Sequence, residues 1–199
     1  MTPTSVLSDE HRVIEVVLDC LEQMSSQARG NGRLDGQSAR EALDFFRVFA
    51  DRCHHGKEEK LLFPALTAKG MPREQGPVGV MLHEHEMGRK LISGMAAQVD
   101  SASAGDRTAL ETFAQHAASY VELLRAHIQK EDHVLFPMAG RILSEAEQHD
   151  LLAAYDTVEQ DHIGVGVHED YLDLAGRLAE KFGVDRTPLD KPTGCCCHH

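Results

Sequence analysis

The chain has 199 residues, a net charge of −12, five cysteines and no tryptophan. This length predicts one domain with a substantial core. The acidic balance argues against a nucleic-acid partner, and the scattered cysteines argue against a disulfide framework. We find no apolar run long enough for a membrane span and no basic-then-apolar leader, so we expect a soluble cytoplasmic protein with no membrane partner.

Apolar residues recur at helical spacing through most of the chain. The pattern predicts four long helices, over residues 6–29, 38–68, 74–100 and 107–143. Thr4 or Ser8 is a candidate N-cap for the first helix. Pro64 and Pro137 should kink the second and fourth helices, because proline has no N–H to donate to the preceding turn.

Further helical patterns follow these four. A fifth stretch covers residues 144–161, the pattern breaks at Gly164–Gly166, and another helix runs to Phe182. The segments lack the period-two alternation typical of strands. We therefore expect an all-α fold, an up-down-up-down four-helix bundle with an additional C-terminal helical segment. The predicted divisions are the bundle (1–143), cover helices packed on it (144–183) and a flexible tail ending in Cys and His (184–199).

A duplicated motif carries most of the functional information. His54-x-x-x-Glu58 and His127-x-x-x-Glu131 are each followed by Leu-Phe-Pro, and each has a Glu-His pair upstream. Residues four apart share one helix face, so each copy aims an imidazole and a carboxylate at the same point. Two such helices facing each other predict a dinuclear metal site. The candidate ligands are His11, His54, Glu58, His85, His127 and Glu131.

Residues 6 to about 140, through these motifs, resemble the hemerythrin family, specifically its bacterial HHE cation-binding branch. The resemblance implies a non-haem di-iron centre inside the bundle. By that match His11 and His54 hold one iron, His85 and His127 hold the other, and Glu58 and Glu131 bridge the pair. The chain departs from oxygen-carrying members, because the position four after His85 is Arg89 rather than histidine. It therefore lacks their fifth bundle histidine.

Imidazole and carboxylate donors suit iron, manganese or zinc. We expect two Fe ions joined by an oxo or hydroxo bridge, with Mn or Zn as alternatives. Two bridging carboxylates offset part of the charge that the metals bring into a buried site, which neutral histidines cannot do. One open position per iron would accept a small diatomic molecule or peroxide, the expected binding partner.

Several other residues near these motifs have alternative interpretations. His55 and Glu59 form a competing pair, but the repeat aligns them with Ile128 and Asp132, so we interpret them as supporting or surface groups. His83 should point outward. Tyr120 is either a core residue or a hydrogen-bond donor to a bound ligand, and His116 is either a core residue or a proton relay. His168, Glu159 and His162 are candidate ligands for the missing fifth position. Cys195–Cys197 form either a soft-metal or redox tail or a disordered end.

Three functions fit this pattern. The leading one is stress defence by reaction with peroxide or nitric oxide, as in catalase-like or NO-reducing chemistry. The second is binding, storage or sensing of O₂ or iron without turnover. The third is iron donation for the repair of iron–sulfur clusters.

Overall fold

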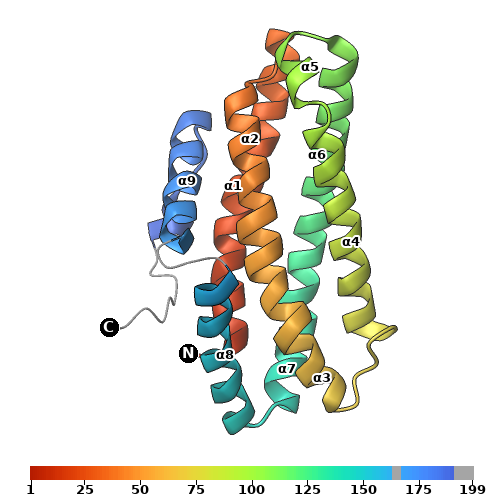
Figure 1. The fold of residues 1–199 in the computed structure, drawn as a ribbon, viewed down its shortest axis with the longest axis vertical. Helices are drawn as coiled ribbons and strands as arrows, with labels where there is room; N and C mark the ends of the chain where they lie inside the picture. The colour runs from red at the N-terminus through yellow and green to blue at the C-terminus, as the bar shows by residue number, and fades with distance from the viewer. Residues whose placement is uncertain (163–166, 191–199) are drawn as a thin grey trace.

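The computed structural model describes residues 1–162 and 167–190. Within these ranges the chain is helical and contains no strand, which confirms the expected all-α bundle. Four long helical rods lie side by side (Figure 1). The first rod is α1 (Pro3–Asn31), and the third is α4 (Gly76–Ala96). The second rod consists of α2 (Gly36–Phe45), η1 (Phe46–His55), η2 (Glu58–Leu62) and α3 (Phe63–Ala68). The fourth rod consists of α6 (Arg107–Lys130), η3 (Glu131–Leu135) and α7 (Phe136–Ile142).

Helix α1 begins earlier than the sequence pattern predicts. Thr2 is its N-cap, and the Thr2 hydroxyl accepts a hydrogen bond from the Ser5 backbone N–H at 3.1 Å. Pro3 follows at the first helical position, where a missing N–H costs nothing. The prediction of Thr4 or Ser8 as the cap was therefore wrong.

Each Leu-Phe-Pro motif follows a π-helical turn. Segment η2 begins at Glu58 and η3 begins at Glu131, and the N–H of the residue before each proline donates to the carbonyl of that glutamate. A π turn pairs residues five apart and is wider than an α turn, and such turns are frequent at functional sites. Where the sequence predicted a kink, the structure has a widened turn that begins at a candidate ligand.

The third rod is shorter than predicted. Helix α4 ends at Ala96, and a separate short helix, α5 (Val99–Ser103), leads into α6. Gly76 opens α4 with a φ of 66°, a left-handed conformation that glycine adopts without strain.

Two hydrophobic clusters fill the bundle. The larger one includes Leu18, Phe46 and Phe113, and the smaller one includes Phe63, Phe136 and Tyr155. Along each rod the polar candidate ligands fall between these clusters, so apolar packing encloses the site from both ends of the bundle.

The C-terminal helices lie along α1 (Figure 1). Helix α9 (Val167–Phe182) packs on α1 and α2, and α8 (Glu145–His162) packs on α1, η1 and η2. The stretch expected as a loose tail contains a 3-10 helix, η4 (Thr187–Asp190), and Val184 packs against the larger cluster. The predicted break at Gly164–Gly166 and the Cys195–Cys197 tail lie outside the described residues.

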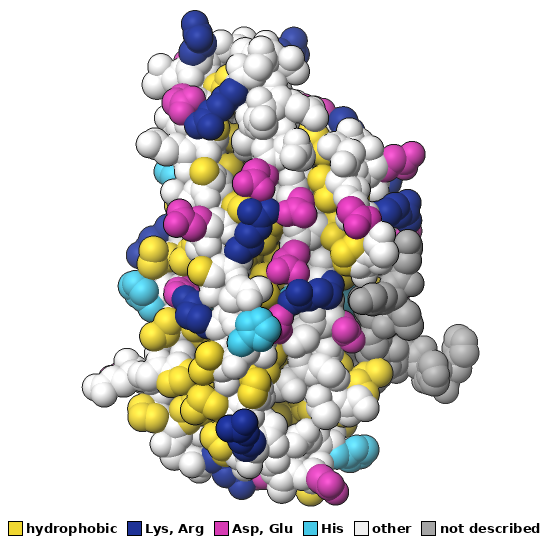
Figure 2. Space-filling model, turned by 180° about the vertical axis from the view of Figure 1, so that it is seen from behind, with side chains coloured by type: hydrophobic (Ala, Val, Ile, Leu, Met, Phe, Trp, Pro, Cys, Tyr) yellow, Lys and Arg dark blue, Asp and Glu magenta, His cyan; other side chains and the backbone are white. Residues whose placement is uncertain are grey.

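The surface carries charge of both signs. Acidic and basic side chains are interspersed over the face of the bundle seen in Figure 2. Among the described helices, none is both long enough and apolar enough to cross a membrane.

Candidate metal centre

The structure brings the six candidate ligands together in the middle of the bundle. Each rod contributes one histidine, and η2 and η3 each contribute the glutamate at which they begin. All six side chains are buried: His11, His54, Glu58, His85, His127 and Glu131.

The histidines form two pairs that face each other through their Nε2 atoms. Nε2 of His11 lies 3.0 Å from Nε2 of His54, and Nε2 of His85 lies 3.2 Å from Nε2 of His127. We call the first pair the first half-site and the second pair the second half-site. Each half-site thus joins one histidine from upstream of the repeat with one from the repeat itself.

The two glutamates span the half-sites. Glu58 places Oε1 3.8 Å from Nε2 of His54 and Oε2 3.4 Å from Nε2 of His85. Oε2 of Glu131 lies 3.2 Å from Nε2 of both His11 and His127. Each carboxylate therefore contacts one histidine of either half-site, which is the arrangement a pair of bridging ligands requires.

The carboxylate oxygens of the two glutamates are buried. All four oxygens of Glu58 and Glu131 are without a hydrogen-bond partner among the described residues. Buried carboxylates without donors are costly, and metal cations remove that cost. Nitrogen and oxygen donors in this number suit a divalent transition metal, so the cluster fits a metal site.

Charge in the centre is balanced by neighbouring histidines. Burial raises the pKa of Glu58 well above its usual value, and Glu131 adds to the rise. Burial also acts to raise the pKa of Glu131, but the nearby His127 and His11 hold it well below the usual range. Burial acts to lower the pKa of His127, but the charge of Glu131 outweighs burial and raises this pKa to about 9. Burial lowers the pKa of His54 to about 4. The pKa values of the two carboxylates are thus shifted in opposite directions, that of Glu58 upward and that of Glu131 downward.

A carboxylate fixes the ring of each histidine. Nδ1–H of His54 donates to Glu10 at 2.9 Å, and Nδ1–H of His127 donates to Glu84 at 3.0 Å. Lys57 donates to Glu10 and Lys130 donates to Glu84, so each of these carboxylates is paired with a lysine three residues after the histidine. Such outer partners fix the ring orientation and direct Nε2 towards a metal.

The other two histidines have matching partners. Nδ1–H of His11 donates to Asp132 at 2.9 Å, and Arg12 pairs with that aspartate. Nδ1–H of His85 donates to Glu59 at 2.7 Å, and Arg89 pairs with Glu59 at 2.6 Å. Glu59 therefore has the supporting role that was one of its two interpretations. Sequence reasoning assigned no role to Glu10 and Glu84, although the repeated Glu-His pair was a signal for them.

His55 lies beside the second half-site, so of its two interpretations, a supporting or a surface group, the surface one was wrong. It is buried, its ring stacks on that of His85, and its Nδ1 lies 3.4 Å from Asp51. His55, Glu58, His85 and His127 each offer a donor atom within 4.8 Å of the others. The repeat alignment with Ile128 concealed this fifth imidazole.

The remaining candidates lie elsewhere. Tyr120 is buried with its ring edge-on to Phe46, and His116 packs against Gly94 rather than among the ligands. His168 is buried near Glu10 and Cys53, not with the six. His83 is exposed, as predicted. The side chains of Glu159 and His162 lie outside the described part of the chain.

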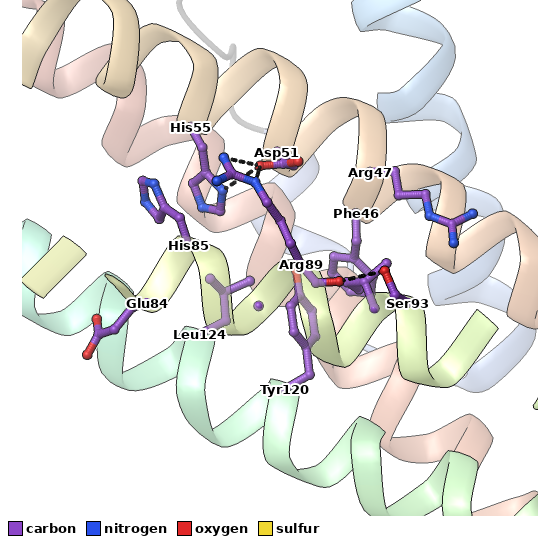
Figure 3. Close-up of a pocket in the computed structure, with 12 residues that line it drawn as sticks. Phe46, Arg47, Asp51, His55, Glu84, His85, Arg89, Ser93, Tyr120 and Leu124 are labelled. Carbon is purple, nitrogen blue, oxygen red and sulfur yellow. Dashed lines mark hydrogen bonds and ion pairs between the residues drawn. The ribbon is translucent and has the colours of Figure 1, made fainter. Parts of the chain in front are cut away.

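A pocket of about 150 Å³ opens beside the second half-site. Figure 3 shows His55 and His85 at one end, Arg47 and Ser93 at the other, and Arg89 between them. Apolar side chains line the pocket together with Gly88: Phe46, Ile92, Tyr120 and Leu124. The pocket therefore connects exposed side chains with the buried histidines.

Comparisons with known proteins fit a metal-binding role for this chain. The family model "Hemerythrin HHE cation binding domain" matches residues 2–139. Uncharacterized proteins of Mycobacterium bovis and Mycobacterium tuberculosis are 24% identical over 184 residues, which cover 92% of this chain and 71% of theirs. The iron-sulfur cluster repair protein YtfE of Edwardsiella ictaluri is 30% identical over 99 residues, or 49% of this chain and 44% of that protein. No solved structure gives a significant match. The family match covers all six residues of the buried cluster, and the chain belongs to the hemerythrin HHE cation-binding family.

Proposed function

We propose that this centre holds two iron ions and that the protein reacts with peroxide or nitric oxide in stress defence. The observation that carries the proposal is the pair of unpartnered carboxylates, Glu58 and Glu131, each placed between two facing histidine pairs. An iron pair held there would supply Lewis acidity and redox equivalents to a small oxidant. Manganese and zinc suit the same donors, and metal analysis distinguishes them.

The chain's own residues bind and orient in this proposal. His11 and His54 would hold one metal, His85 and His127 the other, and Glu58 and Glu131 would contact both. The Nδ1 hydrogen bonds to carboxylates keep every ring in its orientation before metal binds, so little rearrangement is needed.

The pocket supports a small-molecule ligand. It lies against His55 and His85, and its volume of about 150 Å³ exceeds that of one water molecule several-fold. Peroxide or a diatomic gas could therefore approach the second half-site through this pocket.

Metal analysis with an ultraviolet–visible spectrum tests the proposal. Protein from iron-supplied cells should contain two irons per chain, and Glu58→Ala should lose both because the two half-sites share this carboxylate. His83→Ala is the matched control, since His83 is exposed. Loaded protein should then consume peroxide or nitric oxide. Equal iron in Glu58→Ala and the parent would refute the site, and reversible O₂ binding without turnover would refute the enzymatic function.

A second candidate is iron donation to damaged iron–sulfur clusters. The named relative from Edwardsiella ictaluri is a repair protein, and it shares about half of this chain. The test is reactivation of an enzyme with a damaged cluster by the iron-loaded chain. Recovery that exceeds the effect of an equal amount of free iron would favour repair over peroxide chemistry.

A further inference from the structure

Tyr155, on α8, has a buried hydroxyl. The residue is 2% exposed and packs in the smaller hydrophobic cluster with Phe63 and Phe136. Its hydroxyl oxygen has no hydrogen-bond partner among the described residues. Buried tyrosines usually find a partner for the hydroxyl, and leaving one unpaired costs free energy that phenylalanine would avoid.

Tyr155 lies on the helix that packs against the segments of the metal centre. Helix α8 packs against η1 and η2, the segments that carry His54 and Glu58. Nζ of Lys57 lies 5.8 Å from the centre of the Tyr155 ring. Burial raises the pKa of Tyr155 most, Glu58 and Glu131 add to the rise, and Lys57 opposes it. The phenol is therefore within electrostatic reach of both spanning carboxylates.

A phenylalanine would fill the space of the ring equally well, so packing does not explain the hydroxyl. A tyrosine hydroxyl donates one hydrogen bond, and the groups around the centre that lack donors are the oxygens of Glu58 and Glu131. When these oxygens are engaged by metal, a ligand bound in the centre would offer Tyr155 an acceptor.

We propose that the hydroxyl of Tyr155 donates a hydrogen bond to the small anion or oxidant that binds between the two half-sites. This rests on the proposed function and adds to it a donor from outside the matched family region, since residues 2–139 end before α8 begins. The C-terminal helices of this chain thus contribute a group that binds ligand, besides covering the bundle.

The variant Tyr155→Phe removes only the hydroxyl. Tyr171→Phe is the matched control, because the hydroxyl of the partly buried Tyr171 donates to the exposed Asp44 of α2 at 2.7 Å. Two measurements are made on each: the urea midpoint of metal-free protein, and the affinity of iron-loaded protein for azide, read from its charge-transfer band. Azide is a stable small anion that reports on the ligand position without turnover.

Tyr155→Phe should bind iron like the parent and bind azide about tenfold more weakly, the loss expected for one hydrogen bond to an anion. The azide band should shift, and metal-free Tyr155→Phe should be at least as stable as the parent. Tyr171→Phe should leave azide affinity and band unchanged. Unchanged azide affinity and band in Tyr155→Phe, with or without lost stability, would overturn the proposal. A parent that takes up no iron, or whose iron binds no azide, would instead refute the proposed function.

Discussion

The rings of His55 and His85 stack with centroids 3.8 Å apart and planes inclined by 17°. His55 follows His54 directly, yet both side chains are buried at the centre. Both belong to η1, whose residues pair five apart, so successive side chains diverge less around the axis than in an α-helix. The π turn therefore places a fifth imidazole, that of His55, beside the second half-site. The carboxylates that hold the ligand rings, in contrast, are arranged alike in the two half-sites.

The first prediction concerns His55. We expect His55→Ala to weaken the binding of one of the two metals by about 10–100-fold, the usual cost of losing a group that supports or completes a metal site. His54→Ala should weaken the other metal more severely, because His54 faces His11 directly at 3.0 Å. Metal titration followed by calorimetry measures both.

His83→Ala is the control for both variants, because it removes an imidazole that is exposed. Metal binding by His55→Ala that equals that of His83→Ala would show that His55 only packs against His85.

The second prediction compares the two lysines of the repeat. Lys57 is fully buried beside Glu10, whose pKa it helps lower to about 2 against the effect of burial, whereas 40% of the Lys130 side chain is exposed beside Glu84. Lys57→Met should lower the free energy of unfolding by about 3–5 kcal/mol, because the buried Glu10 carboxylate would lose its ammonium partner and keep the hydrogen bond from the His54 ring. Lys130→Met should cost at most about 1 kcal/mol, since water replaces the lost partner.

Urea denaturation of the two variants measures this difference. The pair is matched, because each lysine lies three residues after its histidine and contacts the glutamate that fixes that ring. Equal losses in the two variants would contradict the burial argument, and a large loss only in Lys130→Met would reverse it.

The duplicated motif predicted the bundle and the convergence of its polar residues, because a four-residue spacing fixes the helix face. The sequence pattern, however, predicts an ordinary α-helix through residues 46–62. The structure has π turns there, and they change which side chains face inward. A wide turn depends on the packing of neighbouring rods, which a single helix pattern does not contain. The repeat alone therefore left His55 as a supporting or a surface group.

The C-terminal helices were predicted as elements, but their contribution to the site was not. His168, Glu159 and His162 were considered as donors because histidine and glutamate can bind metal. Tyr155 was not considered, since its side chain reads as an apolar helix position in the sequence. Its unpartnered hydroxyl becomes visible only when α8 is packed against η2.

The third prediction concerns Asp35, the N-cap of α2. Asp35 accepts from the Ser38 N–H at 3.2 Å and from Lys181 of α9 at 2.6 Å, and thus ties the C-terminal helix to the bundle. Asp35→Ala should lower the free energy of unfolding by about 1 kcal/mol at neutral pH through loss of the cap. In a Lys181→Met background the loss should be smaller, which a double-mutant cycle measures.

The effect of Asp35→Ala should also depend on pH. Burial acts to raise the pKa of Asp35, but hydrogen bonds from Lys181 and Ser38 outweigh it and lower the pKa below its usual value. A carboxylate whose pKa is lower in the folded protein than in the unfolded chain contributes its full stabilisation of the fold above the unfolded pKa of about 3.9. This contribution is lost as the pH falls through the pKa of the folded protein. The difference between parent and variant should therefore shrink below about pH 4; a constant difference from pH 7 to pH 3 would contradict this assignment.

The fourth prediction concerns the pocket beside the second half-site. A Cβ atom added at Gly88 would lie 3.4 Å from Cε2 of Tyr120, an ordinary contact, so Gly88→Val should fold and extend its methyl groups into the pocket. Stability should change by no more than about 1 kcal/mol, because valine replaces glycine within a helix. We expect the methyl groups to add about 1.4 kcal/mol to the barrier for ligand entry. Azide should then associate with iron-loaded protein about tenfold more slowly.

Gly140→Val is the matched control for this variant, because Gly140 is exposed in α7 with open space around its Cα. Stopped-flow mixing with azide measures the association rate, and metal analysis checks that parent and variants hold equal iron. We expect slower association only in Gly88→Val, since Gly88 lines the passage between exposed Ser93 and the buried ring of His85. If Gly88→Val holds its iron and binds azide as fast as Gly140→Val, small ligands reach the centre by another route, and the pocket has no role in their entry.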